Sequence, residues 1–374
     1  MSPNRFVSRL LGGRRAGPPR VGYLVYGGGG RHPATAHIRV VGPLTRAAAA
    51  GRISATQIDQ VRFAHGGDPA EYDVVLVQRD VVEPDHVDAF LAECARRRVR
   101  LVFEADDDFV TGPARERLLQ HGYFSTKLDA LRQVVGAADA VIVSTDELAA
   151  TMAPFGAPVT VAPNALDPAL WGADADGGSV GSAIDSAREF VSDDGEFRML
   201  YAGTATHAGD LALLRETVQT LRDETGGRVV LETIGVTGED GDWYRRLPVP
   251  DHAVNLPDFV RWLRSMSGRW SLGLAPLADE DFNRSKSDLK FLEYSMLGLP
   301  VVASAVEPYR GIPAHGGIGV ANTAEAWGDA IRSVLAESSA NAERAATARR
   351  YVESERFEPV GERWLKAVTA RRGR

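Results

Sequence analysis

The first half of the chain alternates short, continuously apolar runs with segments of helical periodicity. Apolar runs predict buried strands at residues 21–26, 72–80, 99–108, 139–145 and 158–166. Helical patterns lie among them at residues 34–51, 84–98, 127–138 and 146–156. Apolar strands separated by helices are typical of a parallel sheet that is covered on both faces. This half therefore predicts a doubly wound α/β domain with right-handed crossovers.

The alternation stops at residues 173–196, which are rich in Gly, Ser and Asp and predict a linker or surface insertion. It then restarts, with strands expected at residues 197–203, 228–236, 271–277, 299–304 and 317–322, and helices at 210–227, 286–297 and 324–336. Two doubly wound domains follow, over residues 20–172 and 197–354. Ligands of open α/β sheets bind at the carboxyl ends of the strands. A cleft between the two sets of strand ends is therefore the expected site.

Composition narrows the class of protein. A length of 374 residues suits two domains, and a net charge of -7 argues against a general nucleic-acid binder, which would need a basic face. Cys94 is the single cysteine, which excludes an intramolecular disulfide or a cysteine-based zinc site and favours a reducing cytoplasm. No apolar run reaches the roughly 18 residues that a transmembrane helix needs. We expect a cytoplasmic monomer or homodimer.

The two ends of the chain carry separate predictions. Residues 1–19 are rich in Arg and lack the apolar core of a signal peptide. They predict a flexible basic tail, or alternatively a short amphipathic turn in weak contact with a membrane surface. The last stretch is helical in pattern and is broken near Pro359.

Residues 283–304, NRSKSDLKFLEYSMLGLPVVAS, predict a helix followed directly by a buried strand. Ser285 and Asp288 fit a capping box that starts the helix after Ser285, with Ser287 as the alternative cap. Gly298 is expected to end the helix. The helix therefore begins at the carboxyl edge of the second sheet, over the expected cleft.

One face of this helix carries Lys286, Lys290 and Glu293, which fall within about 60° of one another at 100° per residue. They form either a solvated rim, with ion pairs worth only tenths of a kcal/mol, or a ligand site. The location favours a ligand, because helix N-termini attract anions and Arg284 adds a further cation. Glu293 lies about 10 Å along the axis from Lys286. That spacing suits a diphosphate at the helix start and a sugar diol at the carboxylate, as a nucleotide-sugar offers.

These segments together resemble the retaining glycosyltransferases of the GT-B fold, especially family 4. The helix of residues 283–304 resembles their donor-site helix, with its lysine, its Leu-Glu-Tyr core and its Gly-Leu-Pro-Val-Val-Ala-Ser end. Residues 200–214 and 231–236 resemble the first strands of the donor domain, and residues 143–152 and 161–171 the end of the N-terminal domain. The resemblance runs in the right order from about residue 20 to 310.

The resemblance implies two Rossmann-like domains, with the acceptor bound mainly by the first and the nucleotide-sugar by the second. It implies that residues 355–374 cross back to the N-terminal domain. Glu293 would hold the nucleotide ribose, and Lys286, helped by Arg284, would neutralise the diphosphate. The chemistry would need no metal and no cofactor, because the NDP-sugar is a co-substrate and cations and helix ends stabilise its charge.

Two departures from the family pattern concern the donor site. Ser285 stands where many relatives carry an acid, and the stretch GTATHAGD at residues 203–210 replaces their Arg and Lys. The glycine run after the first strand is either a plain flexible loop or a backbone cradle that closes over the diphosphate. The candidate donor-binding residues are Gly28, Gly29, Gly203, Thr204, Thr206, His207, Arg284, Ser285, Ser287 and Lys290.

An acidic cluster, EADDDF, follows the strand at residues 99–108. It is interpreted as an acceptor-side or structural group, with a metal site as the less favoured alternative. Asp107 joins Lys286 and Glu293 as a catalytic candidate, and Asp106, Asp108 and His32 are candidates on the acceptor side. Asn164 and Asp167 are expected to form turns.

The sequence therefore predicts a glycosyltransferase that moves a sugar from an NDP-sugar, with UDP or GDP expected, to an acceptor nucleophile with retention of configuration. The acceptor is a small molecule or a glycan. Two alternatives keep the fold: a nucleotide-sugar epimerase or pseudo-glycosyl coupling enzyme, and a non-catalytic sugar-nucleotide-binding protein.

Overall fold

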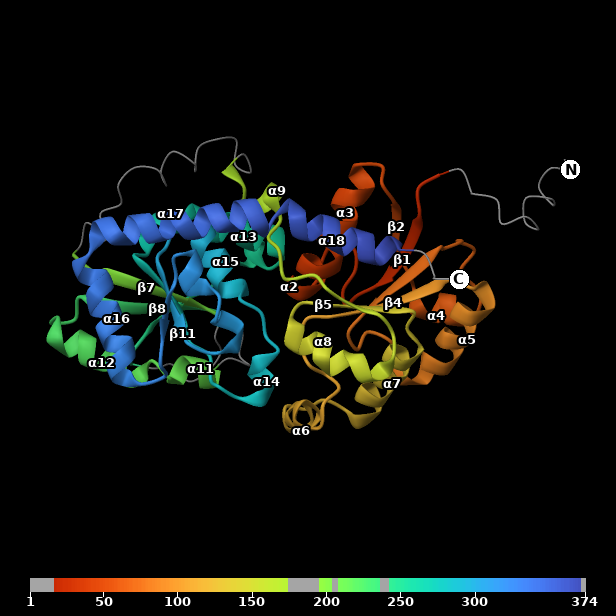
Figure 1. Ribbon diagram of the computed structural model, residues 1–374, viewed down its shortest axis with the longest axis horizontal. Coiled ribbons are helices and arrows are strands. Elements are labelled where there is room, and N and C mark those ends of the chain that lie inside the picture. The colour runs from red at the N-terminus through yellow and green to blue at the C-terminus, as the bar shows by residue number, and fades with distance from the viewer. Residues whose placement is uncertain (1–16, 174–194, 204–207, 236–241, 371–374) are drawn as a thin grey trace, which may run out of the picture.

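The computed structural model describes residues 17–173, 195–203, 208–235 and 242–370. The chain forms two α/β domains side by side, each built on a six-stranded sheet (Figure 1). The N-terminal sheet has the strand order β2-β1-β3-β4-β5-β6, and the C-terminal sheet has the order β12-β11-β10-β7-β8-β9. Every pairing between neighbouring strands is parallel. The predicted pair of doubly wound domains is confirmed.

The N-terminal sheet contains the strands expected from the apolar runs and one more. Its strands are β1 Arg20–Leu24, β2 Ser54–Gln57, β3 Val74–Gln78, β4 Arg100–Ala105, β5 Ala140–Val143 and β6 Val159–Val161. The additional strand, β2, has the polar sequence SATQ and lies at the sheet edge with its side chains exposed or half-exposed. An edge strand buries little, so it carries no apolar run to predict it.

Helices cover both faces of this sheet. They are α2 Ala34–Ala36, the π-helix η1 His37–Val41, α3 Gly42–Ala49, α4 Gln60–Ala64, η2 Pro84–His86, α5 Val87–Arg97, α6 Gly112–Gln120, α7 Ser125–Ala137, α8 Asp146–Met152, η3 Ala153–Phe155 and α9 Pro168–Trp171. The helix predicted over residues 34–51 thus changes pitch in the middle. Pro43 lies just after the π turn and has no N–H to donate into it.

The C-terminal sheet is made of β7 Phe197–Ala202, β8 Val229–Ile234, β9 Arg245–Leu247, β10 Leu272–Ala275, β11 Val301–Ser304 and β12 Ile318–Val320. Its helices are α11 Ala208–Ala212, α12 Arg215–Glu224, η6 Asp251–Ala253, α13 Leu256–Ser265, η7 Ser267–Arg269, α14 Asp281–Arg284, α15 Leu289–Met296, η8 Glu307–Tyr309, η9 Ile312–His315, α16 Ala324–Ala336, α17 Ser338–Glu355 and α18 Glu358–Thr369. β9 was not predicted, because this edge strand is short and rich in Arg.

Each sheet is buried on both faces, as continuous apolar strands require. In β3, Val75 and Val77 belong to the core on one face, whereas Val74 and Leu76 belong to the core on the other. In β7, Leu200 likewise packs on the opposite face from Met199 and Tyr201. The alternation follows from the period of two residues in a strand. Each sheet is therefore the middle layer of its own domain.

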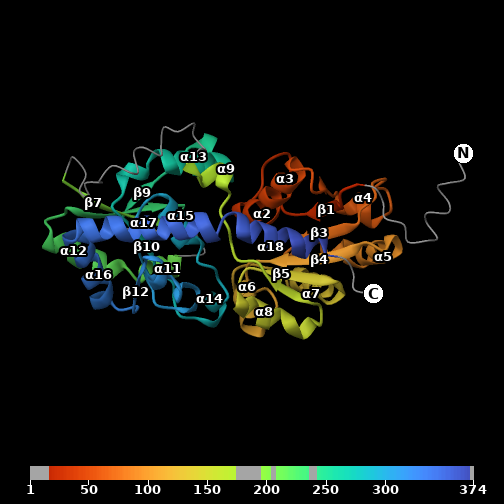
Figure 2. The same ribbon diagram turned by 45° about the horizontal axis from the view of Figure 1, so that its top comes forward.

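The last two helices connect the domains. α17 packs on the C-terminal domain through Ala348 and Val352. α18 places Trp364 and Val368 in the core of the N-terminal domain, although it ends the chain. Figures 1 and 2 show the two helices running across both domains, one after the other. None of the helices in the described ranges is long and apolar enough to cross a membrane.

Candidate functional site

A cleft of about 570 Å³ lies between the two domains at the carboxyl ends of their strands. The C-terminal domain lines it with the residues that follow β7 and β8, including Gly203, and with the start of α15. The N-terminal domain lines it with His32, Asp106 and Asp107, which follow β1 and β4. Open α/β sheets bind ligands at the carboxyl ends of their strands, so the cleft lies where both sheets are expected to bind one.

The charged residues of α15 and of the segment before it lie in this cleft. Lys286, Ser287, Lys290 and Glu293 all line it. The Lys290 ammonium lies 5.7 Å from the centre of the Tyr201 ring. Burial raises the pKa of Glu293 to about 7, partly countered by the nearby charge of Lys290. Burial and the positive charge of Lys286 lower the pKa of Lys290 to about 8. Both groups are poorly solvated in their charged forms, which favours a ligand that supplies hydrogen bonds and opposite charge.

Lys286 and Asp107 meet across the boundary between the domains. The Lys286 Nζ lies 3.5 Å from Asp107 Oδ1 and 5.0 Å from the centre of the Phe282 ring. Both side chains of the pair are partly exposed, at 18% and 27%, so water and ligand reach them. An anionic ligand in the cleft would compete with Asp107 for the lysine. Two of the catalytic candidates are thus in contact.

The other two aspartates of the acidic cluster have different surroundings. Asp106 lines the cleft and accepts a hydrogen bond from Thr35 Oγ1, with an Arg79 guanidinium nitrogen 3.7 Å from its second oxygen. Asp108 is buried and accepts hydrogen bonds from the backbone N–H groups of Val110 and Thr111. The structure therefore does not bring Asp108 into the cleft, because its carboxylate caps its own loop ahead of α6.

The glycine run, residues 27–30, forms a tight turn with Arg31. Gly28 and Arg31 exchange backbone hydrogen bonds of 3.0 and 3.1 Å. Gly27 has a φ of 82°, and a Cβ there would lie 2.2 Å from the Arg31 carbonyl oxygen, so only glycine fits. Gly28 and Gly29 do not line the cleft, whereas His32, just after the turn, does.

The start of helix α15 differs from the prediction. α15 begins at Leu289, and the short α14 precedes it, so the predicted capping box at Ser285 and Asp288 is wrong. Ser285 is buried and donates its hydroxyl to the Phe282 carbonyl. The Asp288 carboxylate accepts hydrogen bonds from the Arg356 guanidinium and does not cap the helix. Gly298, with a φ of 72°, ends the helix as predicted.

Several candidates lie away from the cleft or outside the described residues. Arg284 is exposed, lies 3.4 Å from Asp279 and borders a second, polar pocket formed with the loop after β11. Ser285 does not line the cleft either, and its backbone carbonyl accepts a hydrogen bond from the hydroxyl of Thr145, the N-cap of α8. Thr204, Thr206 and His207 fall outside the described residues, as do most of the basic tail and the linker.

Asn164 is one of the cleft residues that the sequence did not assign to the site. It is 4% exposed and lines the cleft, where its side-chain amide donates to Ser287 Oγ at 2.6 Å. Its Oδ1 accepts from Arg39, which forms a buried ion pair of 2.7 Å with Glu104. The partners are separated from Asn164 by 123 to 125 positions, so no local pattern could indicate them. Asp167, by contrast, caps α9 as a turn residue would and also pairs with Arg46.

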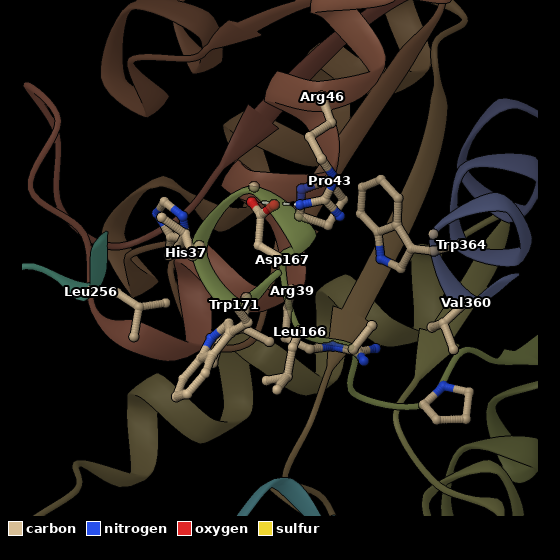
Figure 3. Close-up of a pocket in the computed structure, with 16 residues that line it drawn as sticks. His37, Arg39, Pro43, Arg46, Leu166, Asp167, Trp171, Leu256, Val360 and Trp364 are labelled. Carbon is tan, nitrogen blue, oxygen red and sulfur yellow. Dashed lines mark ion pairs between the residues drawn. The ribbon is translucent and has the colours of Figure 1, made fainter. Parts of the chain in front are cut away.

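Behind the cleft, the two domains meet around a small cavity of about 30 Å³. Figure 3 shows its lining, which includes Arg46 and Asp167 in an ion pair of 2.6 Å, Trp171, Leu256 and Trp364. The lining comes from α3, the loop after β6, the start of α13 and the last helix. The volume holds about one water molecule, so this cavity belongs to the packing of the junction.

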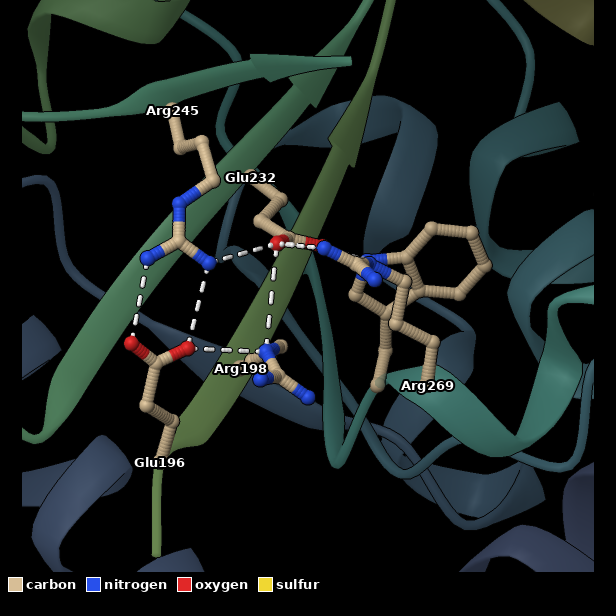
Figure 4. Close-up of polar contacts among 6 residues, drawn as sticks. Glu196, Arg198, Glu232, Arg245 and Arg269 are labelled. Atoms are coloured by element: carbon tan, nitrogen blue, oxygen red, sulfur yellow. Dashed lines mark hydrogen bonds and ion pairs between the residues drawn. The ribbon is translucent and has the colours of Figure 1, made fainter. Parts of the chain in front are cut away.

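A second charged cluster lies in the C-terminal sheet, at the end that is remote from the cleft. Glu232 of β8 is fully buried and accepts hydrogen bonds from Arg269, Arg245 and the Trp270 indole (Figure 4). Glu196, before β7, pairs with Arg245, which holds the pKa of that carboxylate below its usual range. These residues lie near the amino ends of β7 and β9, away from the cleft. Their ion pairs link the edge strand β9 to the rest of the sheet. Nowhere in the described ranges do three or more His, Cys, Asp or Glu side chains gather as a metal ion would require.

Solved structures with the same architecture are numerous, although no protein-family model and no curated protein sequence matches the chain. Sucrose-phosphate synthase from Thermosynechococcus elongatus superposes with a TM-score of 0.62 at 14% identity, over 93% of this chain and 98% of that one. HepE from Anabaena, in complex with UDP-glucose, gives 0.61 at 12% identity, over 94% and 100%. A UDP-forming trehalose-phosphate synthase from Burkholderia xenovorans gives 0.60 at 11% identity, over 95% and 99%. The chain therefore has the GT-B fold of these proteins.

Proposed function

We propose that the protein is a glycosyltransferase that moves a sugar from an NDP-sugar to an acceptor nucleophile. The observation that carries the proposal is the placement of Lys286, Lys290 and Glu293 along one wall of the interdomain cleft. The GT-B fold adds support, since the Anabaena neighbour is described in complex with UDP-glucose and the Burkholderia neighbour as UDP-forming. UDP or GDP is the nucleotide that we propose.

The two lysines would take the diphosphate. Lys290 lies in the first turn of α15 and Lys286 in the segment just before it, where the helix dipole also favours negative charge. A diphosphate would replace Asp107 as the partner of Lys286 and would raise the lowered pKa of Lys290. Negative charge on the leaving phosphate grows during transfer, so preorganised cations bind the transition state more strongly than the ground state. This chemistry requires no metal ion.

Glu293 would hold the ribose. Glu293 follows Lys290 by three residues in α15 and lines the same wall. Its ionised carboxylate can accept hydrogen bonds from both hydroxyl groups of a diol. A sugar attached to the diphosphate would then lie toward the N-terminal domain, where Asp106 and Asp107 line the opposite wall. Asp107, released from Lys286, would accept a hydrogen bond from the acceptor hydroxyl. Retention of configuration is proposed on the family resemblance.

The acceptor is proposed to be a hydroxyl-bearing small molecule or glycan. Every acidic or basic side chain that the N-terminal domain contributes to the cleft lining, apart from His32, is a carboxylate. Carboxylates accept hydrogen bonds from hydroxyl groups and repel anions. A neutral polyol therefore suits this wall better than a phosphorylated acceptor.

The alternative of a non-catalytic sugar-nucleotide-binding protein is favoured by one observation. Ser285, in the place of the family acid, is buried and bonded within its own segment, so it offers no carboxylate to the sugar. Product analysis separates the functions. Transfer releases free NDP and gives a larger product, epimerisation changes the sugar and leaves the nucleotide attached, and binding alone does neither.

The first experiment is a thermal-shift series with UDP-, GDP- and dTDP-sugars, because a ligand that binds the native state raises its stability. We expect one nucleotide series to raise the unfolding midpoint. The Glu293→Ala variant, which lacks the ribose contact, should lose most of the shift. If no NDP-sugar or NDP stabilised the wild-type protein, the proposed function would be wrong.

A further inference from the structure

The last two helices of the described residues meet at a residue that is bonded to the segment before α15. Arg356 lies between α17 and α18 and is 7% exposed. Its guanidinium donates two hydrogen bonds of 2.7 Å to the Asp288 carboxylate, one to each oxygen. Paired, parallel hydrogen bonds between Arg and a carboxylate fix both distance and orientation. Asp288 immediately precedes α15, so this pair holds the start of the donor-site helix.

The same guanidinium also holds the N-terminal domain. Its Nε and Nη2 donate to the backbone carbonyl of Asn164, at 3.0 and 2.7 Å, and the Arg356 carbonyl accepts from the Leu166 N–H at 3.1 Å. A further bond, of 3.0 Å, runs from Nη1 to the Tyr351 hydroxyl. One buried side chain thus joins the loop after β6, the start of α15 and the end of α17.

Asn164 continues the connection to the two walls of the cleft. Its side chain donates to Ser287, which adjoins Asp288, and accepts from Arg39. Arg39 is paired with Glu104, two positions before Asp106 on the N-terminal wall. The bonds therefore run without a break from the end of β4 to the segment that carries Lys286. Glu104, Arg39, Asn164 and Arg356 are buried, where hydrogen-bonded charges are costly to disturb.

We propose that Arg356 is a positioning residue for nucleotide binding: it fixes the start of α15 relative to the N-terminal domain, and so sets where the lysines of that segment lie in the cleft. The proposal rests on the proposed function, since it assigns the purpose of the network to the donor site. Arg356 itself does not line the cleft, so it acts through Asp288 and Asn164.

The test compares Arg356→Lys with Asp288→Asn and with the control Arg349→Lys. Lysine keeps the charge at position 356 but cannot make the paired bonds or reach both partners. Arg349, on the neighbouring helix α17, forms an ordinary ion pair with Glu353 and does not line the cleft. Binding of UDP and of GDP is measured by calorimetry at a temperature at which every variant is folded, and amide hydrogen exchange of α15 is followed in the absence of ligand.

We expect Arg356→Lys and Asp288→Asn each to weaken nucleotide binding by about tenfold or more, as loss of a charge-assisted pair implies, and to speed exchange across the first turn of α15. The double variant should be no weaker than the weaker single variant, because both remove one interaction. Arg349→Lys should change binding by less than about twofold. A change in stability alone would not produce this pattern.

Failure of the proposed function and failure of the positioning role give different results. If the wild-type protein bound neither UDP nor GDP, the proposed function would fail and the positioning role with it. If the wild type bound nucleotide and Arg356→Lys bound it equally well, with unchanged exchange in α15, the positioning role would fail alone. Should Arg356→Lys not fold, Asp288→Asn decides, because it keeps the shape of the side chain and removes only its charge.

Discussion

The Lys286→Ala substitution tests the proposed chemistry most directly. The Lys286 Nζ lies 3.5 Å from Asp107 Oδ1, and a bound diphosphate would replace Asp107 as the partner of the lysine. Two unit charges about 4 Å apart interact by about 4 kcal/mol at an effective dielectric constant of about 20. If about half a unit of negative charge develops on the leaving phosphate, the lysine stabilises the transition state by a further 2 kcal/mol or so, which is roughly 30-fold in kcat.

Affinity for the intact donor should fall much less. On binding, the lysine exchanges the Asp107 carboxylate for a phosphate charge at a similar distance, so its Coulomb attraction changes little and the net gain in the ground state is small. Free NDP carries the charge that the transition state develops. Its affinity should therefore fall by about the same factor as kcat.

The assay combines initial rates of NDP release with calorimetric affinities for the NDP-sugar and for NDP. Lys366→Ala is the matched control, because Lys366 is exposed on α18 and the substitution removes the same charge far from the cleft. Equal losses in kcat and in donor affinity would contradict stabilisation of the transition state. A kcat within about threefold of wild type would show that Lys286 is not at the diphosphate.

Three further predictions concern pH, a buried charge and the glycine turn. Glu293, with a pKa of about 7, gains a proton as the pH falls, and Lys290, with a pKa of about 8, loses one as the pH rises, so nucleotide affinity should peak between these values. Calorimetry across the range should show the acid limb vanish in Glu293→Gln. Glu232→Ala should lower the free energy of unfolding in urea by about 3 kcal/mol, because it leaves arginines without their buried partner, while activity in the cold persists. Gly27→Ala should destabilise the protein by more than Gly30→Ala, since a Cβ at 27 meets a carbonyl oxygen at 2.2 Å whereas the space at 30 is open; equal losses in thermal unfolding would contradict the geometry.

The helix boundary at α15 shows where local rules fail. Ser285 and Asp288 have the spacing of a capping box, yet the helix begins at Leu289. The Asp288 carboxylate makes two charge-assisted bonds to Arg356, which are stronger than one bond to a backbone N–H. Arg356 is 68 positions away, so the competition cannot be read from the segment itself.

The candidate site was predicted unevenly for a related reason. Lys290 and Glu293 share a face of α15 because helical periodicity is a local property, and both line the cleft. Lys286 also lines the cleft, although it precedes the helix. Arg284 precedes the helix in a separate turn, so periodicity did not constrain it, and it lies near Asp279 at another pocket. Asn164 was expected only to form a turn, because a buried amide gains its role from the partners that the fold brings to it.

The sequence by itself determined the two layered domains and the shared face of Lys290 and Glu293 on α15. Both follow from periodic patterns over a few residues, since a strand buried on both faces must be apolar throughout and a helix repeats every 3.6 residues or so. Only the tertiary structure decided the polar edge strands β2 and β9, the start of α15 and the network of Arg356, Asn164 and Arg39. These depend on hydrogen bonds between residues far apart in the chain, and the partner of a polar group is known only once the chain has folded.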